Sequence, residues 1–86
     1  MEIVIDREFE QLIPPLTEEE YTGLEQDIIA NGVKVPVMVW EQPDGTGILI
    51  DGHNRYHICQ RHNIPFNVQP VEISSRNEAL QMILSL

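Results

Sequence analysis

The chain has 86 residues, of which 42% are hydrophobic and 22% are charged, and its formal net charge at pH 7 is −9. This size and composition are typical of one small globular domain. A chain this acidic repels polyanions, so its general electrostatic field argues against direct binding of duplex DNA. The apolar runs are only a few residues long, and we therefore expect no membrane-spanning segment.

The charge is unevenly distributed along the chain. Residues 1–51 hold 12 of the 14 acidic residues and two of the five basic ones, whereas residues 52–86 hold two acidic and three basic residues. The net charge is therefore −10 in the first part and +1 in the second, which also contains all three histidines. Because residues 52–86 carry no net negative charge, they can bind a small anion if their side chains and backbone N–H groups are suitably placed.

The first half predicts a short strand, a helical turn and a longer helix, in that order. Glu2–Asp6 alternates as a strand does, and Phe9–Ile13 makes one helical turn before two prolines stop it. Thr17 is a strong N-cap, with Glu20 at the capping-box position, and the helix ends at Gly32. Its apolar face consists of Tyr21, Leu24 and Ile28, with Ile29 beside it.

The rest of the chain predicts a hairpin, two helices and one further strand. Val33–Glu41 is rich in β-branched residues, and the turn at residues 42–47 returns it to a partner strand at 48–50. A helix then runs to about His62, and Asn67–Ile73 is the next strand. Ser75 and Glu78 form a second capping box that begins the last helix. This order indicates an α/β (α+β) domain with a small mixed sheet and packed helices.

The chain stops at Leu86 inside an apolar helical pattern that has no C-cap. An apolar helix face without a partner is unusual in a complete protein. We therefore expect residues 1–86 to be a single domain trimmed from a longer chain. The alternative is a naturally short protein whose last helix docks on the sheet.

Three further residues are interpreted as packing residues. Cys59 is the only cysteine, so it cannot form an internal disulfide, and helical spacing places it on a buried face. A lone cysteine and an N-terminus without signal-peptide features indicate a cytoplasmic protein. Tyr56 and Trp40 are the other two residues that we interpret as packing residues. The alternative for Tyr56 is stacking on a nucleotide base, and the alternative for Trp40 is contact with a partner protein.

The stretch IDGHNRY carries the candidate functional residues. Gly52 has no side chain, so a ligand can approach the backbone closely. His53 and Asn54 add donors at the start of a helix, where free N–H groups bind anions. Arg55 can make two hydrogen bonds to a phosphate, and Asp51 can orient Arg55 or a metal ion carried by the ligand. Together these residues predict a phosphate-binding turn.

The same turn also has a purely structural interpretation. Strand–Asp-Gly–helix turns occur in many proteins without ligands, and Arg55 could simply pair with Asp51. A zinc site is a further alternative, because His53 and His57 share a helix face near Asp51, but a third or fourth ligand is not visible.

Three blocks of the chain resemble the ParB/sulfiredoxin-like (ParB N-terminal, ParB-like nuclease) domain family. The first is the acidic helix that ends in Asn31-Gly32-Val33. The second is Val35–Val39, which is similar to the family's strand pattern G-V-x-x-P-(apolar)-x-V. The third is Ile50–Tyr56, which is similar to its phosphate-binding turn, (apolar)-x-G-x-x-R. Their order and spacing match, and the resemblance covers nearly the whole chain.

The resemblance implies a nucleotide- or phosphate-binding module of a DNA-associated protein from a plasmid, phage or chromosome system. The implied ligand is CTP or ATP/ADP with Mg²⁺, bound at Asp51–Arg55. ParB itself usually has Glu-Arg-Arg after the glycine, and only Arg55 of these is present. DNA would be contacted only through a segment outside this chain, and a homodimer is compatible with the family.

Two other branches of the family have different chemistry. Sulfiredoxins have a catalytic cysteine directly after the glycine, where this chain has His53, which argues against that activity. Free serine kinases have the turn Asp-Gly-His-x-Arg, as here, and a His-Glu pair before the first helix, whose Glu is the base. Glu8, Glu10 and Glu18 lie nearby in the sequence but do not match that position. An NTP-hydrolysing or phosphotransferase enzyme of unknown catalytic residues is thus the first alternative, and a ligand-free interaction domain is the second.

Overall fold

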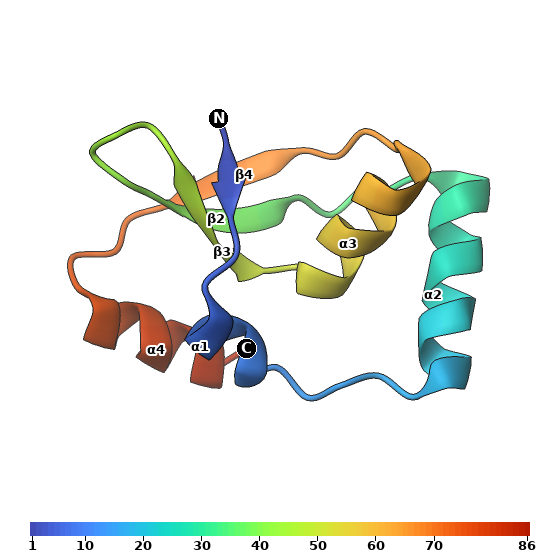
Figure 1. The fold of residues 1–86 in the computed structure, drawn as a ribbon, viewed down its shortest axis with the longest axis horizontal. Helices are drawn as coiled ribbons and strands as arrows, with labels where there is room; N and C mark the ends of the chain where they lie inside the picture. Colours follow the sequence, from blue (N-terminus) through green and yellow to red (C-terminus); the bar gives the residue numbers. More distant parts are fainter.

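The computed structural model describes residues 1–86 as a four-stranded mixed sheet and four helices (Figure 1). This confirms the predicted fold class. None of the helices combines the length and the apolar character needed to cross a bilayer. In chain order the elements are β1 (Ile3–Val4), α1 (Arg7–Gln11), α2 (Glu18–Asn31), β2 (Val37–Glu41), β3 (Gly47–Asp51), α3 (His53–His62), β4 (Val68–Val71) and α4 (Arg76–Leu84).

The predicted hairpin forms the centre of the sheet. The strand order is β1-β3-β2-β4, in which β2 and β3 are antiparallel and each edge strand is added in parallel. The hairpin turn is held by Asp44, whose carboxylate accepts hydrogen bonds from the backbone and the hydroxyl of Thr46. Gly45 adopts φ 89° within it, a conformation that an L side chain disfavours.

Three of the four strands are shorter than the sequence patterns predict, whereas β3 extends one residue beyond each end of the predicted 48–50. The strand predicted from Val33 begins only at Val37, whose N–H donates to the carbonyl of Asn67. Pro36 has no N–H to add to a ladder, so pairing starts directly after it. The first predicted strand is reduced to two residues because Asp6 turns to cap α1. The prediction from Asn67 to Ile73 is also too long, since β4 covers four residues.

Alternation along β2 and β3 divides the core between the two faces of the sheet. Ile50 faces a cluster with Phe9 and α4, so α1 and α4 cover one face. Val37, Val39 and Leu49 point to the other face, where Tyr56 of α3 packs. Figure 1 accordingly shows α1 beside α4 and α3 beside α2.

The helix predictions are largely confirmed. Thr17 and Glu20 form the predicted capping box of α2, and Asn63 ends α3 in the left-handed conformation. Cys59 lies in the core between α2 and α3, as predicted. Ile29 was expected beside the apolar face, but 55% of it is exposed. The second capping box is only half formed, because the carboxylate of Glu78 accepts from the Ser74 hydroxyl instead of closing the box.

A single arginine joins the last helix to the first. Arg76 donates to the carboxylates of Asp6 and Glu8, and its guanidinium lies 4.5 Å from the centroid of the Phe9 ring. These bonds hold the pKa of Asp6 below its usual value and raise that of Arg76. The contact fixes α4 beside α1 over one face of the sheet, away from the predicted phosphate turn.

Candidate functional site

The predicted phosphate turn is built around a glycine that no other residue can replace without strain. Gly52 joins β3 to α3 with φ 97° and ψ 27°, a left-handed conformation that costs a non-glycine residue about 1–2 kcal/mol. A Cβ at this position would lie 2.8 Å from Cγ1 of Val37 and 2.9 Å from Nη2 of Arg55. The space over Gly52, which the sequence suggested for a ligand, is therefore used by Val37 and by the arginine of the turn.

The first turn of α3 has no side-chain cap. The other three helices are capped by Asp6, Thr17 and Ser75, respectively, whereas Gly52 has no side chain to accept a hydrogen bond. The first backbone hydrogen bond of α3 runs from the N–H of Tyr56 to the carbonyl of Gly52, at 2.8 Å. The preceding N–H groups thus have no partner within the helix and lie at the positive end of its dipole.

Arg55 folds back over this turn and is only partly satisfied. Its Nη2 lies 3.7 Å from Oδ2 of Asp51, too far for a hydrogen bond. Nε and Nη2 are enclosed by protein atoms and have no hydrogen-bond partner. Leaving such donors unpaired costs about 1–3 kcal/mol or more for a charged group. The guanidinium therefore holds two unpaired donors, which an acceptor in the turn would reach only after the side chain moves out of its enclosed position.

His53 is the second unsatisfied group. Its side chain is 4% exposed, and both ring nitrogens lack a hydrogen-bond partner. Burial lowers the pKa of His53, and the carboxylates of Glu10 and Asp51 only partly oppose this effect. The ring is therefore neutral near pH 7, with one nitrogen as donor and the other as acceptor.

Three small cavities meet at this turn. The first, of about 180 Å³, is lined by all five predicted site residues and is enclosed by Ile13, Leu16 and Leu24. The second, of about 310 Å³, extends from Arg55 along the C-terminal end of α2 and has Lys34 in its wall. The third, of about 180 Å³, is lined in part by the connector between α1 and α2, and it shares two turn residues with the first. Its lining residues are Glu10, Ile13, Pro14, Pro15, His53, Asn54 and His57.

The third cavity contains an acid that sequence reasoning did not assign. Oε2 of Glu10 lies 2.8 Å from Nε2 of His57, which joins α1 to α3. The two residues are 47 positions apart, and no local motif links them, so only tertiary packing reveals the pair. The histidines and Asp51 considered for zinc are near each other, but no group of three or more His, Cys, Asp or Glu side chains is arranged to hold a metal ion.

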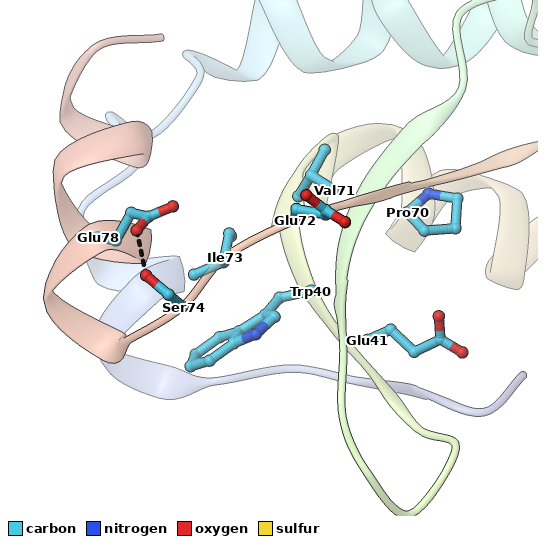
Figure 2. Close-up of a pocket in the computed structure, with 8 residues that line it drawn as sticks. All are labelled: Trp40, Glu41, Pro70, Val71, Glu72, Ile73, Ser74 and Glu78. Carbon is cyan, nitrogen blue, oxygen red and sulfur yellow. Dashed lines mark hydrogen bonds between the residues drawn. The ribbon is translucent and has the colours of Figure 1, made fainter.

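The largest cavity lies elsewhere. Figure 2 shows this hollow of about 620 Å³, at the end of β2 and β4 and beside the start of α4, with Trp40 in its wall. None of the predicted site residues lines it. Size alone does not decide where a phosphate binds. The unpaired donors are at the turn, whereas the large hollow is lined by three glutamates that repel an anion.

Comparison with known proteins establishes the fold. No protein-family model and no curated protein matches the chain. Among solved structures, the chain is similar to the C-terminally truncated chromosome-partitioning protein ParB from Caulobacter crescentus, complexed with CTP-gamma-S. The TM-score is 0.68 and the identity is 22%, over 95% of this chain and 46% of that chain. The chain thus has a ParB-like fold, as its three sequence blocks predicted, and spans less than half of that structure.

Replacing Gly52 with alanine tests the constraint on the turn. We expect Gly52→Ala to lower the free energy of unfolding by about 2–4 kcal/mol, because the left-handed conformation and the contact with buried Val37 both oppose a Cβ. Gly23→Ala is the control: it lies within α2 with open space around it, and alanine should stabilise that helix by about 1 kcal/mol. Urea denaturation measures both. Equal effects of the two substitutions would contradict the geometry of the turn.

The neutral state of His53 predicts a pH dependence of stability. Its folded-state pKa is lowered from 6.5, so the unfolded chain binds this proton first and stability falls as the pH drops below about 6.5. His53→Gln should remove the fall in stability that His53 causes at low pH. His57→Gln, at an exposed position, should show the same fall as the wild type. The check is the free energy of unfolding at several pH values between about 7.5 and 5. A His53→Gln curve parallel to the wild type would show that His53 is not buried as a neutral ring.

Proposed function

We propose that the chain is a nucleotide-binding module of ParB type, in which the Asp51–Arg55 turn binds the phosphates. One observation carries the proposal: the uncapped start of α3 lies beside the enclosed, unpaired donors of Arg55. Backbone N–H groups at a helix start and an arginine fork are the two donor types that bind phosphate most effectively. Asn54 and His53 line the same cavity and supply further polar groups.

Arg55 lines both the first and the second cavity, so a ligand bound to it would extend from the first cavity into the second. Phosphates would occupy the cavity at the turn, where Asp51 can hold an accompanying Mg²⁺. The sugar and base would extend into the second cavity, whose wall combines apolar Leu24 and Val33 with the basic Lys34. CTP, ATP and ADP all contain the phosphates that this arrangement recognises, so the preferred base is decided in the second cavity.

The ParB neighbour was crystallised with a CTP analogue, and this supports a nucleotide as the ligand here. We propose in addition that the module belongs to a cytoplasmic, DNA-associated protein, which contacts DNA through a segment outside these residues and can act as a homodimer. The net charge of −9 supports the view that this module does not contact DNA itself, because DNA is also negatively charged. It does not prevent nucleotide binding, because exposed charges beyond about 8 Å are largely screened at physiological salt.

A phosphotransferase is the second candidate, and the Glu10–His57 pair favours it. Glu10 lines the third cavity together with His53 and Asn54, which also belong to the phosphate turn. A hydroxyl acceptor in that cavity would lie beside bound phosphates. Glu10 would then accept the hydroxyl proton as the oxygen attacks phosphorus and the nucleoside diphosphate leaves, while His57 holds the carboxylate in place.

Nucleotide binding is tested by calorimetric titration of CTP, ATP and ADP with magnesium. We expect Arg55→Ala to weaken binding by about 30-fold or more, since two charged hydrogen bonds together contribute about 2 kcal/mol or more. Arg55→Lys keeps the charge without the fork and should be intermediate. Arg61→Ala is the matched control, because Arg61 lies on the same helix but pairs with Glu25. No binding by the wild type would leave a structural turn in an interaction domain.

Turnover separates the binding module from the enzyme. If the chain transfers phosphate, Glu10→Gln should lower kcat by about 10²-fold or more while the nucleotide Kd stays the same, because the general base is lost and the phosphate turn is intact. Product formation from γ-labelled ATP or CTP with small hydroxyl acceptors is the measurement. Nucleotide binding without any turnover excludes the phosphotransferase and leaves the binding function in place.

A further inference from the structure

The second cavity combines apolar residues with polar side chains that the phosphate turn does not use. Its lining residues are Leu24, Asp27, Ile28, Asn31, Gly32, Val33, Lys34, Val35 and Arg55. Its volume of about 310 Å³ is at the lower end of the range of ligand pockets, which is about 300–1,000 Å³. Of these residues only Arg55 belongs to the phosphate turn, so the others would contact the part of a ligand that lies beyond its phosphates.

One face of α2 supplies both the apolar and the polar part of this wall. Leu24 and Ile28 are one turn apart and belong to the cluster between α2 and α3, where Ile28 is fully enclosed. Asp27 and Asn31 are also one turn apart, and helical spacing places them beside the first pair on the same face. Figure 1 shows α2 beside α3, the helix whose first turn carries Arg55. The polar pair therefore borders the apolar surface of the cavity.

Asp27 and Asn31 together offer two free hydrogen-bond acceptors. Nδ2 of Asn31 donates to Oδ1 of Asp27 at 2.8 Å, and this bond holds the two side chains next to each other. Oδ2 of Asp27 and Oδ1 of Asn31 have no partner in the chain, and Asp27 takes part in no ion pair. An ionised carboxylate accepts hydrogen bonds and donates none. Two neighbouring acceptor oxygens match a ligand group that carries two N–H hydrogens on one atom.

Lys34 adds one donor to the same wall. It lines the second cavity and forms no ion pair in the chain. Its ammonium group can donate to a carbonyl oxygen or to an unprotonated ring nitrogen. Every nucleobase carries at least one such acceptor, so Lys34 would strengthen binding without choosing between bases with an amino group and bases with a carbonyl group.

We infer that the second cavity selects a base with an exocyclic amino group, such as cytosine or adenine, over one with a carbonyl group there, such as uracil or hypoxanthine. The amino group would donate to Asp27 and Asn31, whereas a carbonyl oxygen would face two acceptors with which it cannot form a hydrogen bond. Asp27 and Asn31 are thus the residues that determine base preference. This inference rests on the proposed nucleotide binding and extends it, because phosphates alone do not distinguish these bases.

Two matched pairs of nucleotides test the inference. CTP and UTP, and likewise ATP and ITP, differ only at the amino position and in the proton on the adjacent ring nitrogen. Calorimetric titration of the whole chain with magnesium should give a Kd about ten-fold or more lower for CTP and ATP than for UTP and ITP. The double variant Asp27→Ala/Asn31→Ala should weaken CTP and ATP until both members of each pair bind equally.

The matched control is the double variant Glu19→Ala/Gln26→Ala. It removes the same two functional groups, a carboxylate and an amide, from the same helix. Glu19 and Gln26 line a separate hollow on α2, which shares no residue with the second cavity. This control should therefore keep the preference of the wild type for CTP and ATP.

Two outcomes would overturn the inference while the phosphate site remains. The first is an equal Kd of the wild type for both members of a pair, and the second is an unchanged preference in Asp27→Ala/Asn31→Ala. Arg55→Ala should weaken all four nucleotides by a similar factor, because Arg55 would contact the phosphates that they share. If the wild type binds none of the four nucleotides, the proposed function itself is wrong, and the inference is wrong with it.

Discussion

The structure depends on the absence of one Cβ atom. At Gly52 the chain leaves the central hairpin and begins α3, and the backbone can make this change only in a left-handed conformation. Val37 of the neighbouring strand and the guanidinium of Arg55 both pack against the space that a side chain would fill. The position of α3 on the sheet, the open first turn of that helix and the direction of Arg55 therefore follow from the same constraint.

This arrangement leaves polar groups unsatisfied in the folded chain. The buried donors of Arg55 and the ring nitrogens of His53 lack partners, and each such group costs about 1–3 kcal/mol. The apolar clusters on both faces of the sheet offset this cost, with Leu49 and Ile50 among the fully buried residues. A ligand that supplies acceptors would remove part of the cost and bind only the folded state, so the proposed nucleotide binding would raise the stability of the folded chain.

Local patterns predicted the elements that local interactions determine. The capping box at Thr17 and the hairpin turn were predictable because their partners lie within three residues of each other. The clamp between Arg76 and α1 joins residues 70 positions apart, and the Glu10 contact spans 47. Sequence reasoning grouped Asp51–Arg55 in one candidate turn, and the structure brings all five residues to one cavity. Sequence reasoning could not predict that Arg55 would fill the space over Gly52. Side-chain direction in that turn depends on the neighbouring strand.

The most direct test of the phosphate site is a nuclear magnetic resonance titration of the ¹⁵N-labelled chain with CTP, ATP and ADP in the presence of magnesium. Phosphate binding predicts that the largest amide shifts occur at His53, Asn54 and Arg55, whose N–H groups have no partner within the helix. Smaller shifts should follow around Lys34, and the amides near Trp40 should stay unchanged. If all three nucleotides leave the amides of the turn unshifted, the turn is not a phosphate site.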